Sequence, residues 1–494
     1  MTPPAPVDFV EAGSVELADQ EGTVIVFCDG DGALTGAAAE VDRLTGGALG
    51  RVVGADGFKP APRKLTRLAY PAGMAAEAVI LASLGADPDR EAARQAGGAI
   101  GSAAGRGAVT LAAEGVADAD LTAEMIFAAV LKNYRFDVYK KGAQGDDDKP
   151  KGITLTVLTD APEALAAASA PFAALAEGIF FTRDLVNEPA NTLTTDEFAA
   201  RLAAMGEMGL EVEILGEPEL AEMGANALLG VGLGSDNETK LVVMKWMGGG
   251  DEAPLALVGK GVIFDTGGIS LKPAGGMEDM TMDMGGAGVV AGVMRTVALR
   301  KAKANVVGVV GLVENMPDSR AQRPGDIVTS MKGDTIEIIN TDAEGRLLLA
   351  DALWYTQETF KPSGIVDLAT LTGAIIVALS KSTAGHFCND DAFDAEYQAA
   401  CAATGDKTWR MPLDQSYHDQ IKSTFADVKN TGGRNGGSCT AAAFLEKFIQ
   451  DDMPWIHIDI AGVAVATGGT HMAPKGATGW GVAALDAMVK GRES

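Results

Sequence analysis

Short apolar segments alternate with helix-like segments along most of the chain. In the first 160 residues, strand-like apolar runs are predicted at 23–27, 78–81, 109–112 and 153–158. Between them, residues 90–104 and 121–134 carry apolar side chains at helical spacing. This β-α-β rhythm is typical of a parallel or mixed sheet covered by helices, so we predict an α/β fold.

The alternation of strand-like and helix-like segments is interrupted twice and then resumes. Residues 140–151 read KKGAQGDDDKPK, which favours a solvated loop. The Ala-rich segment 161–186 predicts one long helix or two abutting helices, and the composition changes at 187–191. We therefore expect a small N-terminal α/β domain at 1–160, a linking helix at 161–187 and a larger α/β domain with a mixed sheet flanked by helices at 188–494.

The second α/β rhythm fills this larger domain. Helices are predicted at 288–299 and 347–355. The predicted strands are 212–215, 241–246, 255–258, 306–313, 336–339, 365–368 and 456–460.

Charge and cysteine content narrow the class of protein. The 494 residues include 40 Lys+Arg and 67 Asp+Glu, a formal charge of -27, which disfavours binding to nucleic acid or anionic lipid. Four cysteines form no CxxC pair, which is typical of a reducing compartment. No secretory signal is visible, and apolar stretches such as 306–313 and 375–379 are too short to span a bilayer. We expect a soluble cytoplasmic protein.

Common catalytic motifs are missing from the sequence. The four histidines form no HExxH, and neither GxSxG nor a P-loop occurs. The Gly-rich stretch 230–234 lacks the full dinucleotide-binding spacing, so a plain loop is favoured over a nucleotide site.

Two polar segments follow predicted strands. The first is GKGVIFDTGGISLKP at 259–273, with Asp279 and Asp283 beyond it, and the second is NTDAEGRL at 340–347. In open α/β sheets, binding sites form outside the carboxyl ends of strands, so these segments are expected to meet. Seven of their charged residues are candidates for chemistry: Lys260, Asp265, Lys272, Asp283, Asp342, Glu344 and Arg346.

The charges alone admit two interpretations. Four carboxylates brought together repel one another unless cations neutralise them, and divalent metal ions with oxygen ligands do this well. Two ions sharing bridging carboxylates are one familiar arrangement. The alternative is structural, because Asp342 could cap the following helix and Lys260–Asp265 could form an ordinary ion pair.

At these two segments the sequence resembles the leucine aminopeptidase (cytosol aminopeptidase) family, whose members use two metal ions. NTDAEGRL is similar to the family's signature octapeptide, and 259–273 followed by MTMDMGGA at 280–287 is similar to its other hallmark. Further similar stretches are RDLVNEPAN at 183–191, ATLTGA at 369–374, CTAAAFL at 439–445 and HIDIAGVA at 457–464. The resemblance covers roughly residues 175–485 and implies a catalytic metallopeptidase domain at 188–494 and a homohexamer.

The resemblance also implies roles for individual residues. The ligands of two divalent ions per subunit, Zn²⁺ or Mn²⁺, would be Lys260, Asp265, Asp283, Asp342 and Glu344. Lys260 would bind as a neutral amine, while Asp265 and Glu344 would bridge the ions. Lys272 would stabilise the oxyanion, and Arg346 would hold a bicarbonate ion that acts as general base.

The implied activity is release of N-terminal amino acids from peptides. The pocket for the first side chain would be lined by Met280, Thr370, Gly373, Ala461 and Ala464. These residues carry no charge, so Leu-like side chains are expected to be preferred over Asp or Lys. Two alternatives are a DNA-binding regulator, disfavoured by the acidic charge, and a catalytically inactive scaffold of the same fold.

Overall fold

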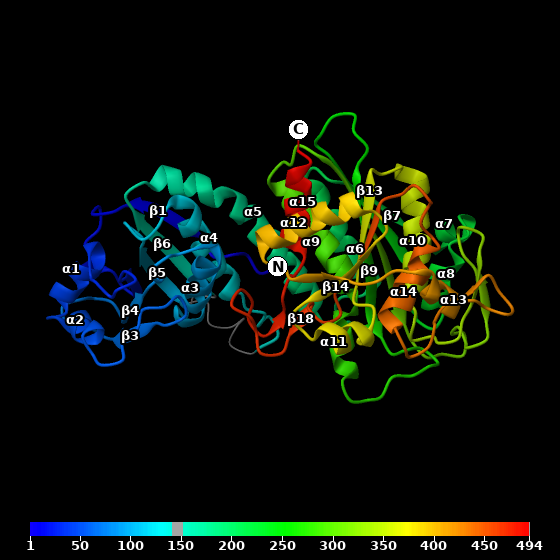
Figure 1. Cartoon of the computed structure of the whole chain (residues 1–494), viewed down its shortest axis with the longest axis horizontal. Helices are drawn as coiled ribbons and strands as arrows, with labels where there is room; N and C mark the ends of the chain where they lie inside the picture. The colour runs from blue at the N-terminus through cyan, green and yellow to red at the C-terminus, as the bar shows by residue number, and fades with distance from the viewer. Residues whose placement is uncertain (141–151, 494) are drawn as a thin grey trace. The chain divides into compact units, whose positions relative to one another are not determined.

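The computed structural model describes residues 1–140 and 152–493, and the chain divides into two compact units (Figure 1). The first unit comprises Met1–Phe180 together with Thr467–Lys475. The second comprises Phe181–Ala466 together with Gly476–Ser494. Of the predicted solvated loop at 140–151, residues 141–151 lie outside the described residues.

The first unit contains a six-stranded sheet with the order β1-β6-β5-β2-β4-β3. All neighbours pair in parallel except β3, which runs antiparallel to β4. Its strands are β1 (Val7–Glu11), β2 (Thr23–Phe27), β3 (Thr66–Ala69), β4 (Ala78–Ala82), β5 (Gly107–Ala112) and β6 (Ile153–Thr159). The four predicted strands are confirmed. The edge strands β1 and β3 were not predicted, because their residues are only partly buried and form no continuous apolar run.

Helices cover this sheet, and the two predicted ones are confirmed. The helices are η1 (Leu17–Asp19), α1 (Gly36–Leu44), α2 (Ala48–Val53), α3 (Arg90–Ala103) and α4 (Ala119–Lys132). Helices α3 and α4 pack against each other, and Arg94 Nε lies 2.8 Å from Glu124 Oε2 in a buried ion pair between them.

One helix, α5 (Pro162–Asn187), runs from the first unit into the second. The segment forms one helix of 26 residues rather than two, with Pro171 inside it. It also has the length and apolar composition of a membrane span, contrary to the expectation that the apolar stretches of this chain are too short to cross a bilayer. Length and composition do not by themselves place a helix in a membrane, and the charged residues Arg183 and Asp184 near its end are buried within the protein.

A late segment of the chain completes the first unit. Strands β18 (Val465–Ala466) and β19 (Gly476–Ala477) pair antiparallel, and the nine residues between them belong to the first unit. Lys132 Nζ of α4 donates a hydrogen bond to the Ala473 carbonyl at 2.8 Å. A Cβ at Gly98 of α3 would lie 1.9 Å from the His471 carbonyl oxygen, so only glycine permits this close approach.

The second unit contains a mixed eight-stranded sheet with the order β15-β14-β17-β13-β9-β10-β8-β7. Central strands β13, β9 and β10 are parallel, while β8 runs antiparallel to β10 and β14 to β17. Its strands are β7 (Glu211–Leu215), β8 (Lys240–Met247), β9 (Leu255–Asp265), β10 (Asn305–Asn315), β13 (Gly364–Ala369), β14 (Ala384–Cys388), β15 (Thr408–Arg410) and β17 (Trp455–Asp459).

Helices pack on both faces of this sheet, and successive residues of β9, which point to opposite faces, contact different helices. Val258 and Val262 of β9 belong to one buried cluster with Leu348 of α10 (Gly345–Phe360). A Cβ at Gly259, on the other face, would lie 2.7 Å from the Ala287 Cα of α9 (Gly285–Leu299). The remaining helices of this unit are α6 (Thr195–Ala203), η2 (Ala204–Met208), α7 (Glu217–Glu222), α8 (Asn226–Gly232), η3 (Met277–Met284), α11 (Gly373–Leu379), α12 (Asp391–Thr404), α13 (Gln415–Gln420), α14 (Gly437–Glu446) and α15 (Val482–Gly491).

Two sequence interpretations need correction. The run 336–339 forms only the short strand β12 (Thr335–Glu337), in a separate sheet with β11 (Ile327–Thr329) and β16 (Val428–Lys429). The Gly-rich stretch 230–234 is the end of helix α8 and the residues after it, not a plain loop. Close packing explains its small residues, since a Cβ at Gly232 would lie 2.1 Å from Thr239 Oγ1.

Candidate functional site

A cavity of about 520 Å³ in the second unit brings together all seven charged candidates of the sequence analysis. Lys260 and Asp265 come from β9, and Asp283 comes from η3. Asp342 and Glu344 lie in the turn before α10, whose second residue is Arg346. Lys272 lies on the loop between β9 and η3. The structure therefore brings the two polar segments, 259–273 and 340–347, to the same cavity, as expected from the sequence.

The strand that carries Lys260 is longer than the sequence pattern suggested. Strand β9 continues to Asp265, so Lys260 projects from its middle and is not at its end. Gly345 makes room for this side chain at the start of α10. A Cβ at Gly345 would lie 2.6 Å from Lys260 Cδ and 2.8 Å from its Nζ, so a larger residue would displace the ammonium.

Lys260 holds two of the buried carboxylates. Its Nζ lies 2.7 Å from Asp283 Oδ2 and 2.8 Å from Glu344 Oε1. Burial lowers the pKa of the Lys260 ammonium, but the charges of these two carboxylates outweigh burial and raise the pKa above its ordinary value. Burial raises the pKa of the Asp283 carboxyl well above its usual range, against the attraction of Lys260.

Lys272 holds the other two carboxylates. Its Nζ lies 2.7 Å from Asp265 Oδ2 and also contacts Asp342 Oδ1. Burial raises the pKa of both carboxyl groups. Burial lowers the pKa of Lys272, but the charges of Asp265 and Glu344 outweigh this and raise it, so Lys272 stays protonated at neutral pH. The side chain of Lys272 is 20% exposed, against 3% for Lys260, so Lys272 is the lysine that a substrate can reach.

The carboxylates fit a metal centre. Oxygen atoms of Asp265, Asp342 and Glu344 all lie within 4.8 Å of one another, which is close enough to share an ion. Within the described part of the chain, no group donates a hydrogen bond to the buried Glu344 Oε2. A buried carboxylate oxygen without a partner is costly unless a ligand satisfies it, and oxygen-rich sets of this kind suit divalent cations.

Arg346 is buried beside these carboxylates. Its Nη1 donates a hydrogen bond to the Asn430 carbonyl at 2.8 Å. Burial lowers the pKa of the guanidinium to about 10, which still leaves it charged at neutral pH. No described residue pairs with the buried Nε, so this atom is available to an anion.

Three polar residues position the ligands, and this role was not predicted from the sequence for any of them. Asn315, the last residue of β10, donates from Nδ2 to Asp265 Oδ1 at 2.8 Å. Thr370 Oγ1 donates to Asp283 Oδ1 at 2.8 Å. Asn430 accepts from the Ile339 amide at 2.8 Å and donates to the Asn340 carbonyl at 2.7 Å, which fixes the turn before α10. A polar residue at the end of an apolar strand was the available signal for Asn315.

The residues expected around the first side chain are only partly on the cavity wall. Met280, Thr370, Gly373 and Ala461 line the cavity. Ala464 is not among the lining residues and is buried, with 6% of its surface exposed. A Cβ at Gly285 would lie 3.3 Å from Thr370 Cγ2 and 3.5 Å from Ala464 Cβ, so these two residues lie against the same point of the chain.

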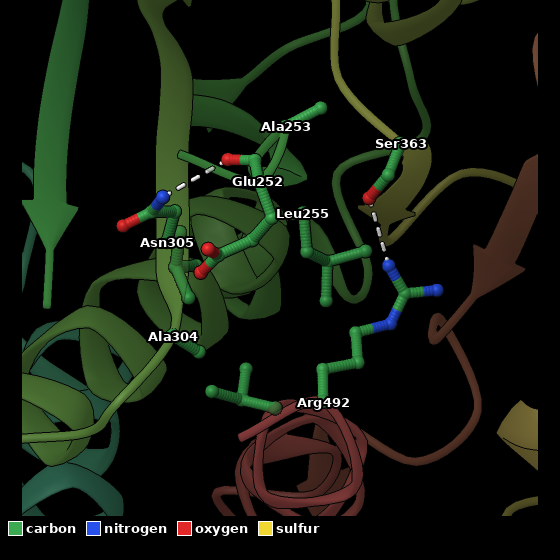
Figure 2. Close-up of a pocket in the computed structure, with 9 residues that line it drawn as sticks. Glu252, Ala253, Leu255, Ala304, Asn305, Ser363 and Arg492 are labelled. Carbon is green, nitrogen blue, oxygen red and sulfur yellow. Dashed lines mark hydrogen bonds between the residues drawn. The ribbon is translucent and has the colours of Figure 1, made fainter. Parts of the chain in front are cut away.

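Figure 2 shows another cavity of the second unit, of about 300 Å³, at the amino ends of β9 and β10. Its polar groups bind one another. Asn305 Nδ2 donates to the Glu252 carbonyl at 2.9 Å, and Arg492 Nη1 donates to Ser363 Oγ at 2.9 Å. Arg492 Nε also lies 2.6 Å from Glu396 Oε1. Because these groups are satisfied internally, we assign no ligand to this cavity.

Comparison with known proteins gives the same picture over the whole chain. The catalytic-domain model of the cytosol aminopeptidase family matches residues 180–486, and the family's N-terminal-domain model matches residues 25–143. A probable cytosol aminopeptidase of Cereibacter sphaeroides is 56% identical, with 99% of each chain covered. One of Dinoroseobacter shibae is 54% identical, again with 99% of each chain covered.

A solved structure agrees with these relatives. The bottromycin maturation enzyme BotP in complex with Mn has a TM-score of 0.83 and 32% identity, covering 96% of this chain and 99% of that one. The family predicted from the two polar segments is thereby confirmed, as is the fold of two α/β domains with a long helix between them in the sequence. The chain belongs to the cytosol aminopeptidase family and is a metallo-aminopeptidase.

Proposed function

We propose that this enzyme releases Leu-like N-terminal residues from peptides in the cytoplasm, using two divalent metal ions per subunit. The proposed ligands are Lys260, Asp265, Asp283, Asp342 and Glu344. The observation that carries this assignment is the convergence of four carboxylates on one cavity, with the buried Glu344 Oε2 lacking a partner among the described residues. Zn²⁺ and Mn²⁺ both accept such a ligand set.

The chain's own residues have separate tasks in this proposal. When bound, the metal ions would polarise the scissile carbonyl and acidify a water molecule. Lys272 is charged and partly exposed, so it donates to the carbonyl oxygen as negative charge develops there. Lys260 must lose its proton to become a ligand, because an ammonium has no lone pair.

Arg346 would hold an anion beside the reacting water. We assign this anion as bicarbonate, which would take up the proton of that water. The guanidinium of Arg346 is charged, and no described residue accepts a hydrogen bond from its Nε. Arg346 also lies at the start of α10, where backbone N–H groups favour negative charge.

Removal of metal tests the proposal directly. Treatment with a chelator should abolish hydrolysis of a leucine amide, and Zn²⁺ or Mn²⁺ should restore it, because the carboxylates alone supply no electrophile. The measurement is metal content per subunit by mass spectrometry alongside turnover. Full activity in protein shown to be free of metal would contradict the proposal.

The role of Ala464 can be tested through substrate preference. Ala464 lies against the same point as Thr370, so Ala464→Met should push the pocket wall inward and lower the Phe-to-Leu ratio of kcat/KM. One or two methylene groups are worth roughly 1–3 kcal/mol, so a change of about tenfold or more is expected. Hydrolysis of Leu, Met, Phe and Asp amides by both proteins gives this ratio. An unchanged ratio would remove Ala464 from the pocket.

The remaining proposals concern assembly. By family resemblance we propose a homohexamer, and domain boundaries at 1–160, 161–187 and 188–494. None of the proposed catalytic residues lies in the first 160 residues, so we assign the N-terminal domain to assembly or access. Light scattering of the intact protein measures the subunit number.

A further inference from the structure

The cavity wall carries one cation that the proposed chemistry does not use. Arg434 lines the same cavity as the metal-site residues and is exposed. Within the described residues it forms no hydrogen bond and no ion pair. Arg434 differs in this from the other three cations of the cavity. Lys260 and Lys272 are paired with carboxylates, and Arg346 is buried against Asn430.

Arg434 lies on the loop between Asn430 and helix α14 (Gly437–Glu446). The base of this loop is fixed to the turn before α10. Asn430 is fully buried, and its side chain bonds to the Ile339 amide and the Asn340 carbonyl. After Asn430 the chain turns through Gly433 and Gly436, both with positive φ, into α14. The loop therefore stands next to the turn that carries Asp342 and Glu344, and not on η3, which carries Met280 of the proposed side-chain pocket.

The electrostatic setting favours an incoming anion at this position. The whole chain has a formal charge of -27, so its net charge disfavours the approach of peptide carboxylates. An exposed, unpaired guanidinium on the cavity wall is the place where such a carboxylate gains a partner, and its planar fork matches two carboxylate oxygens. The cavity volume of about 520 Å³ suits a small ligand such as a short peptide.

We propose that Arg434 is a specificity-determining residue that binds a carboxylate on the C-terminal side of the scissile bond, in the part of the substrate that follows the N-terminal residue. This inference rests on the proposed function of the same cavity. The carboxylate could be the free C-terminus of a dipeptide or an acidic side chain at the second residue. In both cases Arg434 selects short or acidic peptides over neutral, amidated ones.

Two pairs of substrates separate these sources. Leu-Gly against Leu-Gly amide tests the free C-terminus, and Leu-Asp amide against Leu-Asn amide tests the side chain. The native enzyme should prefer the charged member of at least one pair. Arg434→Gln should lower that ratio of kcat/KM by roughly two- to fivefold, as expected for an exposed ion pair. Arg434→Lys should restore part of the ratio, and added salt should weaken it in the native enzyme.

The control is Arg67→Gln, which removes the same charge from an exposed position on β3 of the first unit. It should leave both ratios unchanged. The inference is overturned if the native enzyme shows no preference in either pair, or if Arg434→Gln keeps the native ratios. Turnover separates this inference from the proposed function. An enzyme inactive on all four substrates would contradict the proposed function, whereas an enzyme that hydrolyses the neutral amides but shows no preference for the charged substrates would contradict only the role of Arg434.

Discussion

Glu344→Ala and Glu344→Gln are expected to lose bound metal and with it peptide hydrolysis. Glu344 offers one oxygen to Lys260 and leaves Oε2, buried and without a partner among the described residues, for a cation. The Gln variant keeps the volume of the side chain and removes only its charge, so its loss of metal cannot be attributed to a cavity. Metal content per subunit and kcat/KM on a leucine amide are the two measurements.

A matched control is Glu207→Ala, on the exposed surface of η2 in the same unit. It should retain metal and activity. Thermal unfolding of each variant distinguishes loss of metal from loss of fold. If Glu344→Gln bound a full complement of metal and turned over at the native rate, Glu344 would not be a ligand.

Lys272→Ala should separate chemistry from metal binding. Loss of this ammonium leaves the carboxylates of Asp265 and Asp342 with less positive charge nearby, which favours retention of a cation. The lost donor to the oxyanion should lower kcat by about 10²–10³-fold. Single-turnover kinetics and metal analysis on the same preparation measure both effects.

The control for Lys272 is Lys245→Ala, because Lys245 on β8 pairs with Glu211 on the neighbouring strand β7 and does not line the cavity. It should keep the native kcat. A Lys272→Ala protein with empty metal sites would show that Lys272 belongs to the metal-binding set and does not act on the substrate alone.

The sequence predicted which residues form the site better than it predicted the strands and helices that carry them. The segments 259–273 and 340–347 contain six of the seven charged residues, so short-range patterns were sufficient to find them. The extent of β9 was missed because Gly259, Lys260 and Gly261 interrupt its apolar run. Strand β12 was placed with the main strands because its apolar run looks like theirs, although it pairs in another sheet.

Contacts between distant residues explain what the sequence could not predict. Asn315 lies 50 positions from Asp265, and Asn430 lies 84 positions from Arg346. No local periodicity reports such a pairing, because a single polar residue after a strand or before a glycine loop is common. Ala464 is the opposite case. It belongs to a recognisable motif, HIDIAGVA, yet it is not among the residues that line the cavity.

The late position of the segment Thr467–Lys475 in the chain affects how the first unit folds during translation. This segment is part of the first unit, yet it leaves the ribosome nearly 300 residues after Phe180. At roughly 5–20 residues per second, the contacts of Lys132 with Ala473 and of Gly98 with His471 form some 15–60 s after the rest of that unit has emerged. The amino-terminal part of the nascent chain must therefore wait, incomplete, until translation is nearly finished.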